Sequence, residues 1–366
     1  MKYFPQLTGY RFIAAFLVFL FHYNPFPEQS FLWSICKELY IGVSLFFVLS
    51  GFLIAYLYLP VKMQSAKVFK VFLGRRFARI YPLFFILTVA YYVFRFVSAN
   101  KDHSFTEIFL NLTLLKGFSD KYLLTGVMQA WSLTVEETFY LLSPIIFFLI
   151  REKRIFWLQL PVFFITGILL VVVFEFLKAP FFERMHFMWF TTFFGRCTEF
   201  FLGILLARQM LENKAAPSRG FTLTIAGTSM ILICILIMSF LQKLNDVPYS
   251  SLSLHGLLIN NFLLPFSIYL LLRGLLVERT YFSALLATPA VELMGRSSYA
   301  FYLLHAGIFA EFLLKFSKGN IFFQFLLVQI LSIAAFRLFE QPVNMFMKRR
   351  FFNQEKLPGW ERNEVH

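Results

Sequence analysis

Residues 9–23 read GYRFIAAFLVFLFHY, a stretch that is apolar enough to cross a membrane except for Arg11 and His22. Eleven residues of α-helix make about three turns, so these two side chains lie on one face, roughly 16 Å apart along the axis. Ionisable groups at membrane depth usually face a bundle interior or a wet cavity and mark a functional site. This polar stripe therefore indicates a membrane helix that takes part in a site.

The rest of the chain is equally apolar. Hydrophobic residues make up 59% of the 366 residues and include 53 phenylalanines, and this exceeds what a soluble chain carries. The composition predicts an all-α, polytopic membrane protein. Stretches of about 17–25 residues are long enough to cross the hydrocarbon. About ten such helices are predicted, at 10–26, 39–59, 77–97, 131–150, 155–177, 187–208, 221–241, 256–276, 297–315 and 321–347.

Lysine and arginine concentrate in alternate loops, which is typical of cytoplasmic loops. The richest clusters lie at 62–79, 151–154, 208–219 and 348–356. This distribution predicts that both termini are cytoplasmic, with one membrane domain at 1–350 and a polar cytoplasmic tail at 351–366. The net charge of +14 therefore reflects topology and contact with membrane lipids, and nucleic acid is not expected as a partner.

The longest outer loop is predicted at 98–130, where Lys101, Lys116 and Lys121 are offset by nearby acidic residues. Elsewhere, the three cysteines, Cys36, Cys197 and Cys234, follow neither a metal-ligand spacing nor a disulfide framework. No metal site is expected.

Two histidines lie within predicted spans that run outward. These are His22 and His305, the latter at the end of GRSSYAFYLLH. Both are expected in the middle to outer part of the bilayer, where a neutral imidazole can take up a proton. A histidine in a membrane helix can instead only hydrogen-bond across helices. That alternative stays open for both, and more so for His305.

Two adjacent acids open the fourth predicted span, in WSLTVEETFYLL. Glu136 and Glu137 point about 100° apart on a helix, so at most one of them faces a given cavity. A carboxylate beside a neutral histidine holds its tautomer and stabilises the imidazolium. We assign that role to Glu136, and an interfacial, solvated position is the alternative, chiefly for Glu137.

The segment FLGRRFARIYP places Arg76 and Arg79 three residues apart on one helical face, just before Pro82. Positive-inside topology alone explains one or two arginines here. Clustered guanidinium groups, with Arg11 also toward the inner side, favour a polyphosphate ligand that approaches from the cytoplasm.

The remaining polar groups of the predicted spans are interpreted as structural. Arg196 and Glu199 stand at i and i+3 in FFGRCTEFFLG and form a candidate buried ion pair. Ser50 and Gly51 form a small-residue notch that lets a helix or a ligand approach the backbone. Glu340, in FRLFEQP, is expected to help close the last span.

In chain order, these motifs resemble the acyltransferase 3 family of integral membrane acyltransferases, which O-acetylate surface carbohydrates and related molecules. The resemblance covers nearly the whole chain. It rests on the Arg11 to His22 spacing, GVSLFFVLSGFLI, RRFARIYP, WSLTVEETFY, RCTEFFLG, SSYAFYLLH and FEQP.

The resemblance implies a ten-helix membrane acyltransferase with acyl-CoA, usually acetyl-CoA, as donor substrate and no permanently bound cofactor. The acceptor is a hydroxyl of a glycan or a lipid-linked sugar, and the setting is the bacterial inner membrane. His22 resembles the catalytic histidine and Glu136 its carboxylate partner. The residues that resemble substrate-binding and CoA-binding positions are Arg11, Arg76, Arg79, Tyr299 and His305.

Some features depart from the family pattern. Ser44 stands where many relatives carry an acid, and Gln341 where lysine is common. Some relatives also carry a fused extracytoplasmic domain that this sequence lacks, so the protein is expected either to complete the transfer alone or to pass its product to a separate extracytoplasmic protein.

Two other classes of protein fit part of the pattern. A transporter or flippase for a lipid-linked sugar also needs intramembrane histidine, arginine and glutamate, but the sequence has no internal repeat and no matched pair of broken helices. A receptor or structural subunit gives no reason for Arg11 and His22 to share one helical face.

Overall fold

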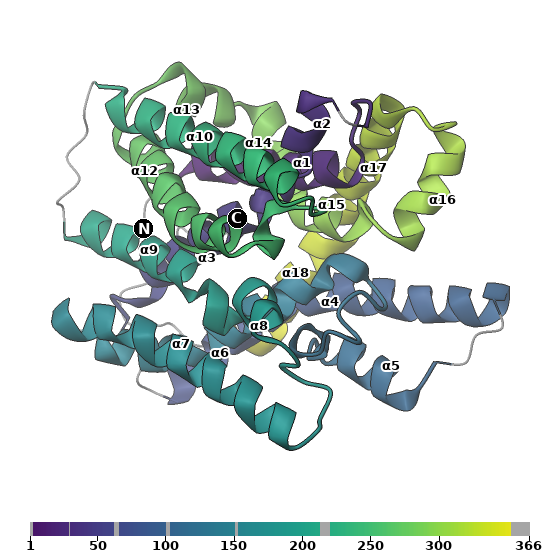
Figure 1. Ribbon diagram of the computed structural model, residues 1–366, viewed down its shortest axis with the longest axis horizontal. Coiled ribbons are helices and arrows are strands. Elements are labelled where there is room, and N and C mark those ends of the chain that lie inside the picture. The colour runs from purple at the N-terminus through teal and green to yellow at the C-terminus, as the bar shows by residue number, and fades with distance from the viewer. Residues whose placement is uncertain are drawn as a thin grey trace. The chain divides into compact units, whose positions relative to one another are not determined.

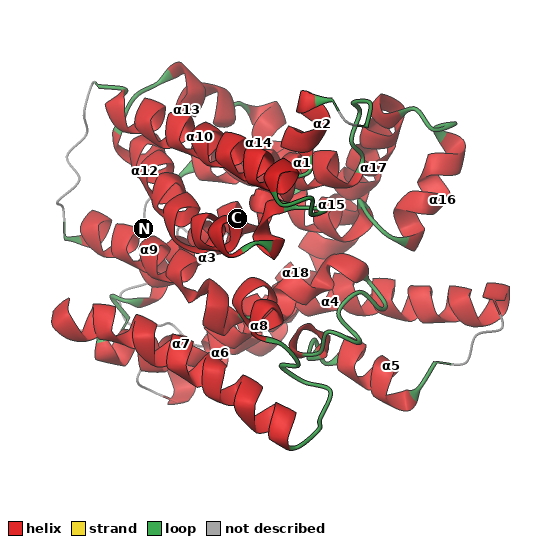
Figure 2. Cartoon of the chain, in the orientation of Figure 1, coloured by secondary structure: helices red, strands yellow, loops and turns green. Residues whose placement is uncertain are grey.

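The computed structural model describes residues 3–28, 30–61, 66–99, 103–150, 153–212 and 220–352. Every regular element in these ranges is a helix, as Figure 2 shows. The predicted all-α fold is confirmed. Parts of the predicted basic loops, at 62–65, 151–152 and 213–219, lie outside the described residues, as does the predicted tail from residue 353 onward.

The chain divides into two compact units. The first, Met1–Pro60 and Arg196–Ser298, joins the start of the chain to its middle, and Figure 1 shows α1 in purple beside α14 in green. Its helices are α1 (Pro5–His22), α2 (Phe31–Cys36), α3 (Gly42–Tyr58), most of α9 (Phe193–Leu211), α10 (Thr222–Leu244), α11 (Leu254–Leu258), α12 (Leu264–Val277), α13 (Tyr281–Leu286) and α14 (Pro289–Arg296).

The second unit comprises Val61–Gly195 and Tyr299–His366. Its helices are α4 (Ala66–Ala99), α5 (Phe105–Leu112), α6 (Trp131–Leu149), α7 (Lys153–Phe176), α8 (Met185–Thr191), most of α15 (Ser298–Leu304), α16 (Ile308–Phe316), α17 (Ile321–Ala335) and α18 (Gln341–Met347).

Eight helical segments of the described chain are long and apolar enough to cross a membrane, and α15 with α16 adds a ninth if this pair, bent by 87°, is one span. These nine segments correspond to nine of the ten predicted spans. The remaining predicted span is the first one, at 10–26, which corresponds to α1. It is not among the nine, because the mean hydropathy of its 18 residues is lowered by Pro5, Gln6, Arg11 and His22. The protein is thus a multi-pass membrane protein, whereas the cytoplasmic placement of both termini stays a prediction.

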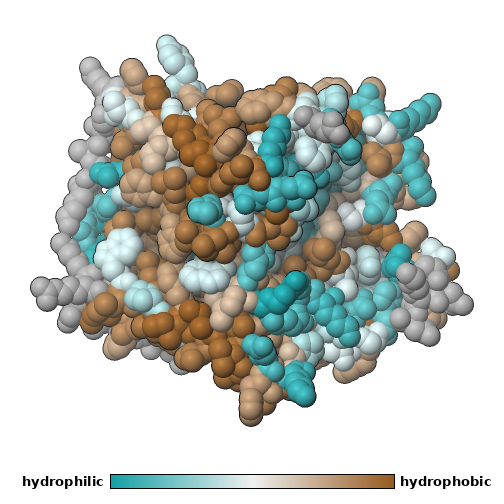
Figure 3. All heavy atoms as spheres, viewed as in Figure 1, coloured by the Kyte–Doolittle hydropathy of each residue, from teal (hydrophilic) through white to brown (hydrophobic). Residues whose placement is uncertain are grey.

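The exposed surface of the long helices is apolar. On α7, the exposed side chains of Leu158, Val162, Ile165 and Leu169 recur every three or four residues and so form one stripe. Figure 3 shows hydrophobic side chains in brown over much of the face in view, including the region where Figure 1 places α7. Such a stripe costs free energy in water but none against lipid tails, so we assign it to the lipid boundary.

Glycines let α1 pack closely within the first unit. A Cβ on Gly9 would lie 2.0 Å from the carbonyl oxygen of Leu286, and one on Gly295 would lie 1.9 Å from that of Thr8. Close backbone contact at small residues is how membrane helices gain packing energy. The helix that carries Arg11 is therefore fixed along its first turns.

The C-terminal end of α1 differs from the prediction. The helix ends at His22, whereas the predicted span ran to residue 26. The Tyr23 N–H still donates to the Phe19 carbonyl at 2.8 Å, but Pro25 and Pro27 follow and provide no N–H for further turns. His22 consequently stands at a helix terminus rather than one turn inside a span.

Candidate functional site

His22, the predicted catalytic histidine, has an exposed side chain at the end of α1. Its imidazole packs edge-on to the Phe21 ring, with the ring centroids 4.9 Å apart. Phe21 in turn packs edge-on against Tyr40 at 5.7 Å. These contacts orient the histidine while leaving its ring accessible to a substrate.

Arg11 lies on the same helix and is half-buried. Because α1 is a continuous helix between the two residues, the predicted common face and the separation of roughly 16 Å follow from helix geometry. The structure therefore holds Arg11 and His22 as two ends of one rigid stripe.

Arg196 and Glu199 form the predicted ion pair on α9, and both side chains are almost fully buried, at 1% and 0% exposure. The Arg196 guanidinium donates to both carboxylate oxygens of Glu199, at 2.8 and 2.7 Å. It also donates to the Ser44 hydroxyl at 2.9 Å and lies over the Phe47 ring. The pair thus fastens α9 to α3.

The notch at Ser50 and Gly51 is occupied by another helix. A Cβ on Gly51 would lie 2.3 Å from the Phe200 carbonyl oxygen, and one on Gly203 would lie 2.1 Å from that of Val48. The backbones of α3 and α9 therefore touch. A helix or a ligand was predicted to lie in the notch, and the structure places a helix there.

In the second unit, one tyrosine links two of the predicted site residues. The Arg76 guanidinium lies 5.9 Å from the centroid of the Tyr140 ring and 6.0 Å from that of Phe72. The Tyr140 hydroxyl donates to a carboxylate oxygen of Glu136 at 3.0 Å. Arg76 and Glu136 therefore share Tyr140, which the sequence reasoning missed. Its position four residues after Glu136, on the same helical face, is the signal that could have revealed it.

Of the two residues of the late motif, Tyr299 docks α15 onto α4, and His305 contacts a residue of α15 itself. The Tyr299 hydroxyl donates to the Ile80 carbonyl on α4 at 2.6 Å, directly after the half-buried Arg79. His305 is fully buried, and its Nδ1 lies 2.8 Å from the Tyr302 carbonyl oxygen. A carbonyl only accepts hydrogen bonds, so Nδ1 carries the proton. Tyr299 thus contacts the turn that holds the arginines.

The tip of α15 also contacts the segment that leads into α6. The Tyr302 and Ser132 hydroxyls lie 2.9 Å apart, and the Gln129 side chain donates to the Leu303 carbonyl at 2.7 Å. Beyond this contact the chain bends at Gly307, whose φ of +73° is a conformation that favours glycine. The bend therefore lies close in sequence to His305.

Glu340 is buried and ends a π-helical turn, Phe336–Glu340. The last span does not close there, because the helical path continues through α18 and the apolar segment extends to Phe351. Pro342 has no N–H to donate, and a local π-turn accommodates this without ending the helix. The helix therefore continues past Glu340, and the role of this motif at the end of the last span stays a prediction.

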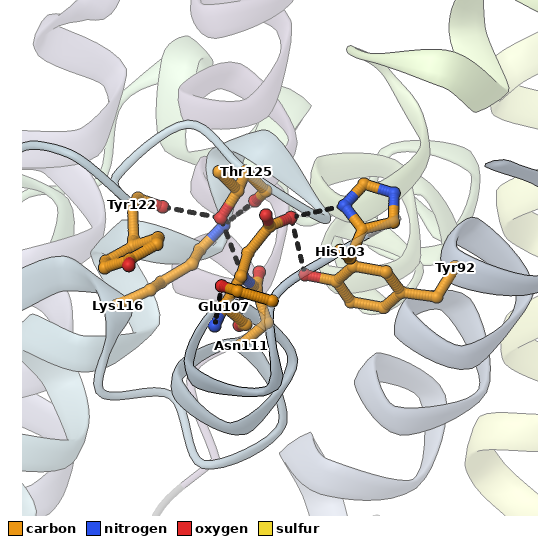
Figure 4. A network of polar contacts seen from close by, with 8 residues as sticks. Tyr92, His103, Glu107, Asn111, Lys116, Tyr122 and Thr125 are labelled. Carbon is orange, nitrogen blue, oxygen red and sulfur yellow. Dashed lines mark hydrogen bonds and ion pairs between the residues drawn. The ribbon is translucent and has the colours of Figure 1, made fainter. Parts of the chain in front are cut away.

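A polar network in the predicted outer loop was also missed (Figure 4). Lys116, counted in the sequence as a loop charge, is fully buried. Its Nζ donates to the carbonyls of Thr125 and Val127, each at 2.6 Å. Asn111 donates to the Thr125 hydroxyl at 2.7 Å. These bonds hold the loop against α5.

Lys116 predicts a specific dependence of stability on pH. Burial lowers its pKa to about 7, and the Glu107 charge offsets only part of this effect. Between pH 7 and the usual lysine pKa of about 10.4, the unfolded chain therefore binds a proton that the folded chain has lost. Stability in detergent is expected to rise with pH across this window, by up to about 1.4 kcal/mol per pH unit.

The measurement is the thermal unfolding midpoint at several pH values for the wild type and two variants. Lys116→Met is expected to lack this rise, whereas Lys121→Met, at an exposed position in the same loop, is expected to keep it. An unchanged pH dependence in Lys116→Met would show that another group causes it.

Of the residues described, no three histidine, cysteine, aspartate or glutamate side chains lie together in a way that could hold a metal ion. The predicted pairing of His22 with Glu136 joins residues of different units and stays a prediction. So does the convergence of Arg11 with Arg76 and Arg79.

Comparison with known proteins gives a match over almost the whole chain. A family model described as an acyltransferase domain, that of the acyltransferase 3 family, matches residues 4–339. The peptidoglycan O-acetyltransferase OatA of Listeria monocytogenes is 28% identical over 97% of this chain and 57% of its own length. The O-acetyltransferase OatA of Staphylococcus aureus is 24% identical over 93% of this chain and 57% of its own.

A further relative, the acyltransferase MdmB of Streptomyces mycarofaciens, is 30% identical over 42% of each chain. The chain thus spans little more than half the length of the two OatA proteins. No solved structure matches it.

Proposed function

The chain belongs to the acyltransferase 3 family, and from this premise we propose that it is a membrane-embedded O-acetyltransferase. In this proposal an acetyl group passes from acetyl-CoA on the cytoplasmic side to a hydroxyl of a cell-surface glycan or a lipid-linked sugar. The observation that carries the proposal is the family match over residues 4–339, which includes the helix with Arg11 and His22 and the segments around Arg76 and Glu136.

The arginines suit the donor. Coenzyme A carries several phosphates, and guanidinium forks bind phosphate through paired, charge-assisted hydrogen bonds. We assign this contact to Arg76 and Arg79 on α4 and to Arg11 on α1. The aromatic rings that flank Arg76 restrict its motion, so less conformational entropy is lost when a phosphate binds.

His22 is assigned the catalytic step of acetyl transfer, in one of two ways. Its imidazole either removes the proton from the acceptor hydroxyl during attack on the thioester or accepts the acetyl group and then passes it on. Glu136 is assigned as its carboxylate partner. In this role Tyr140 is a positioning residue, because its hydroxyl donates to Glu136.

The names of the relatives guide the choice of acceptor. Two of them are called O-acetyltransferases, and the name of one specifies peptidoglycan. We therefore take an envelope glycan as the acceptor class and the bacterial inner membrane as the location. We propose that the chain completes the transfer itself, and passage of the acetyl group to a separate extracytoplasmic protein is the alternative.

The assignment of Arg76 predicts a kinetic effect. Loss of one charge-assisted hydrogen bond costs about 1.5–3 kcal/mol, so Arg76→Ala is expected to raise the KM for acetyl-CoA by about 10- to 100-fold. The comparison is Lys70→Ala, which removes an exposed basic side chain from the same helix and is expected to leave KM unchanged. A normal KM in Arg76→Ala would remove this residue from the donor site.

The function is tested in the host. Mass spectrometry of its surface glycans, with and without this protein, is expected to show one additional acetyl group on a defined sugar when the protein is present. Identical glycan masses would contradict the proposed function.

A further inference from the structure

A histidine and a glutamate form a second pair in the segment between α4 and α6 (Figure 4). His103 immediately precedes Ser104, the N-cap of α5, and Glu107 lies in the first turn of that helix. The His103 Nδ1 lies 2.9 Å from Oε1 of Glu107. The Tyr92 hydroxyl donates to the same oxygen at 3.2 Å. The carboxylate therefore accepts two hydrogen bonds on one atom.

This arrangement fixes the tautomer of His103. A carboxylate oxygen can only accept hydrogen bonds, and this one also accepts from Tyr92. The bond to His103 therefore requires the proton on Nδ1. The other ring nitrogen, Nε2, then presents a lone pair. A histidine held by a carboxylate at one nitrogen, with a lone pair at the other, is the arrangement of a general base.

The pair is not needed to cap α5. The Ser104 hydroxyl already accepts the Glu107 backbone N–H at 3.2 Å. In a capping box the glutamate side chain would reach back to the N-cap backbone, whereas here it holds the histidine. The geometry thus favours a role for Glu107 in orienting the imidazole.

Nearby polar atoms lack partners among the described residues. The Nε2 of His103 is buried without one, and so are Oδ1 of Asn111 and Nε of Arg95. Asn111 itself is fully buried. Unpaired buried polar atoms cost free energy unless bound water or a ligand pairs with them. Two of these atoms accept hydrogen bonds and one donates, which is compatible with the hydroxyls of a sugar.

Aromatic rings stand beside the pair. The ring centroids of Tyr92 and Tyr91 lie 5.0 and 6.4 Å from that of His103. Together with Glu107, these tyrosines are the titratable groups whose contacts with His103 the structure records. A tyrosine side chain has an apolar ring and a polar hydroxyl, so it is a suitable surface for a sugar.

The pair lies beside the second half of α4. Tyr92, which contacts both His103 and Glu107, stands thirteen residues after Arg79, a rise of about 20 Å. If Arg76 and Arg79 bind the donor at the cytoplasmic face, His103 lies past the middle of the hydrocarbon core, which is about 30 Å thick, and toward the face where an envelope glycan is found.

We propose that His103, oriented by Glu107, is the general base for the acceptor hydroxyl toward the outer face. This rests on the proposed function in the form in which His22 accepts the acetyl group. The hydroxyl proton moves to Nε2 of His103 as the oxygen forms a bond to the acetyl carbonyl carbon. The bond from that carbon to its carrier, the imidazole nitrogen that holds it, breaks. The carrier leaves with the electron pair and takes up the proton that His103 releases.

The experiment uses the full-length protein in proteoliposomes with acetyl-CoA and soluble peptidoglycan fragments as the acceptor probe. Transfer of acetyl to the fragments, and release of CoA without acceptor, are measured from acidic to neutral pH. His103→Gln is expected to lower acceptor transfer by about 10²- to 10⁴-fold. The KM for acetyl-CoA and the CoA release are expected to stay at wild-type values.

The separation of kcat from KM gives a readout that a structural role would not leave intact. A base that acts only on the acceptor hydroxyl lowers kcat for acceptor transfer and leaves the KM for acetyl-CoA unchanged, whereas a structural defect changes both. Glu107→Gln, which leaves the base in place but disturbs its orientation, is expected to have a smaller loss. His255→Gln, at an exposed histidine of α11, serves as the matched control.

The outcomes separate the two proposals. If the wild type transfers no acetyl group, the proposed function fails. The assignment of His103 as the acceptor base is overturned by either of two results in an active wild type. The first is that His103→Gln transfers acetyl to the fragments as fast as the wild type. The second is that folded His103→Gln also loses CoA release. Should His103→Gln unfold, transfer by Glu107→Gln at the wild-type rate would overturn it.

Discussion

His22→Ala is expected to lower acetyl transfer by about 10²- to 10⁴-fold, the contribution of a general acid or base. The imidazole is the assigned group through which the proton or the acetyl group passes, and alanine supplies neither function. The structure makes this variant informative, because His22 is exposed at the end of α1. Its removal leaves no cavity in the core, so normal insertion and an unchanged unfolding midpoint are expected.

The matched control for His22 is His255→Ala, which removes another exposed histidine of the same unit. Acetyl transfer is measured alongside membrane insertion and thermal unfolding. Wild-type acetylation by His22→Ala would refute the catalytic assignment. Mass spectrometry of the wild type incubated with acetyl-CoA alone separates the two roles, because an acetyl group on His22 identifies it as a carrier.

Glu199→Gln is expected to produce the largest loss of stability. The variant leaves the Arg196 guanidinium buried at 1% exposure without its charged partner. Removal of one member of a buried ion pair costs about 3–5 kcal/mol. A correspondingly lower thermal unfolding midpoint in detergent is the measured result.

The same helix provides the control for Glu199. Arg208 and Glu212 form a second ion pair at the end of α9, at 2.7 Å, with side chains that are 23% and 34% exposed. Solvent-exposed pairs of this kind are worth about 0–1 kcal/mol, so Glu212→Gln is expected to change the midpoint little. Equal losses in the two variants would mean that burial does not determine the strength of the pair.

Much of the fold could be predicted because apolar stretches and basic loops follow directly from the physics of the bilayer. The end of α1 was placed too far along, at residue 26, because the two prolines at 25 and 27 stop the helix earlier. The local pair of Arg196 and Glu199 was predictable because residues three apart on a helix are neighbours.

Other parts of the site depend on how distant segments meet. Tyr140 joins Arg76 to Glu136 only after α4 packs against α6. Lys116 had the appearance of a solvated loop charge, but the loop folds over it and its Nζ is satisfied by backbone carbonyls. His103 and Glu107 are four residues apart at the start of a helix. This spacing was missed because the acidic residues of the loop were considered only as charges.

The central claim is that this membrane protein transfers acetyl groups to glycan hydroxyls. Its most direct test is to incubate the purified protein in proteoliposomes with radiolabelled acetyl-CoA and peptidoglycan fragments. We expect label to become attached to the fragments as an ester that mild alkali removes, and His22→Ala to lower this labelling by about 10²- to 10⁴-fold. Folded wild-type protein that leaves the fragments unlabelled would contradict the proposed function.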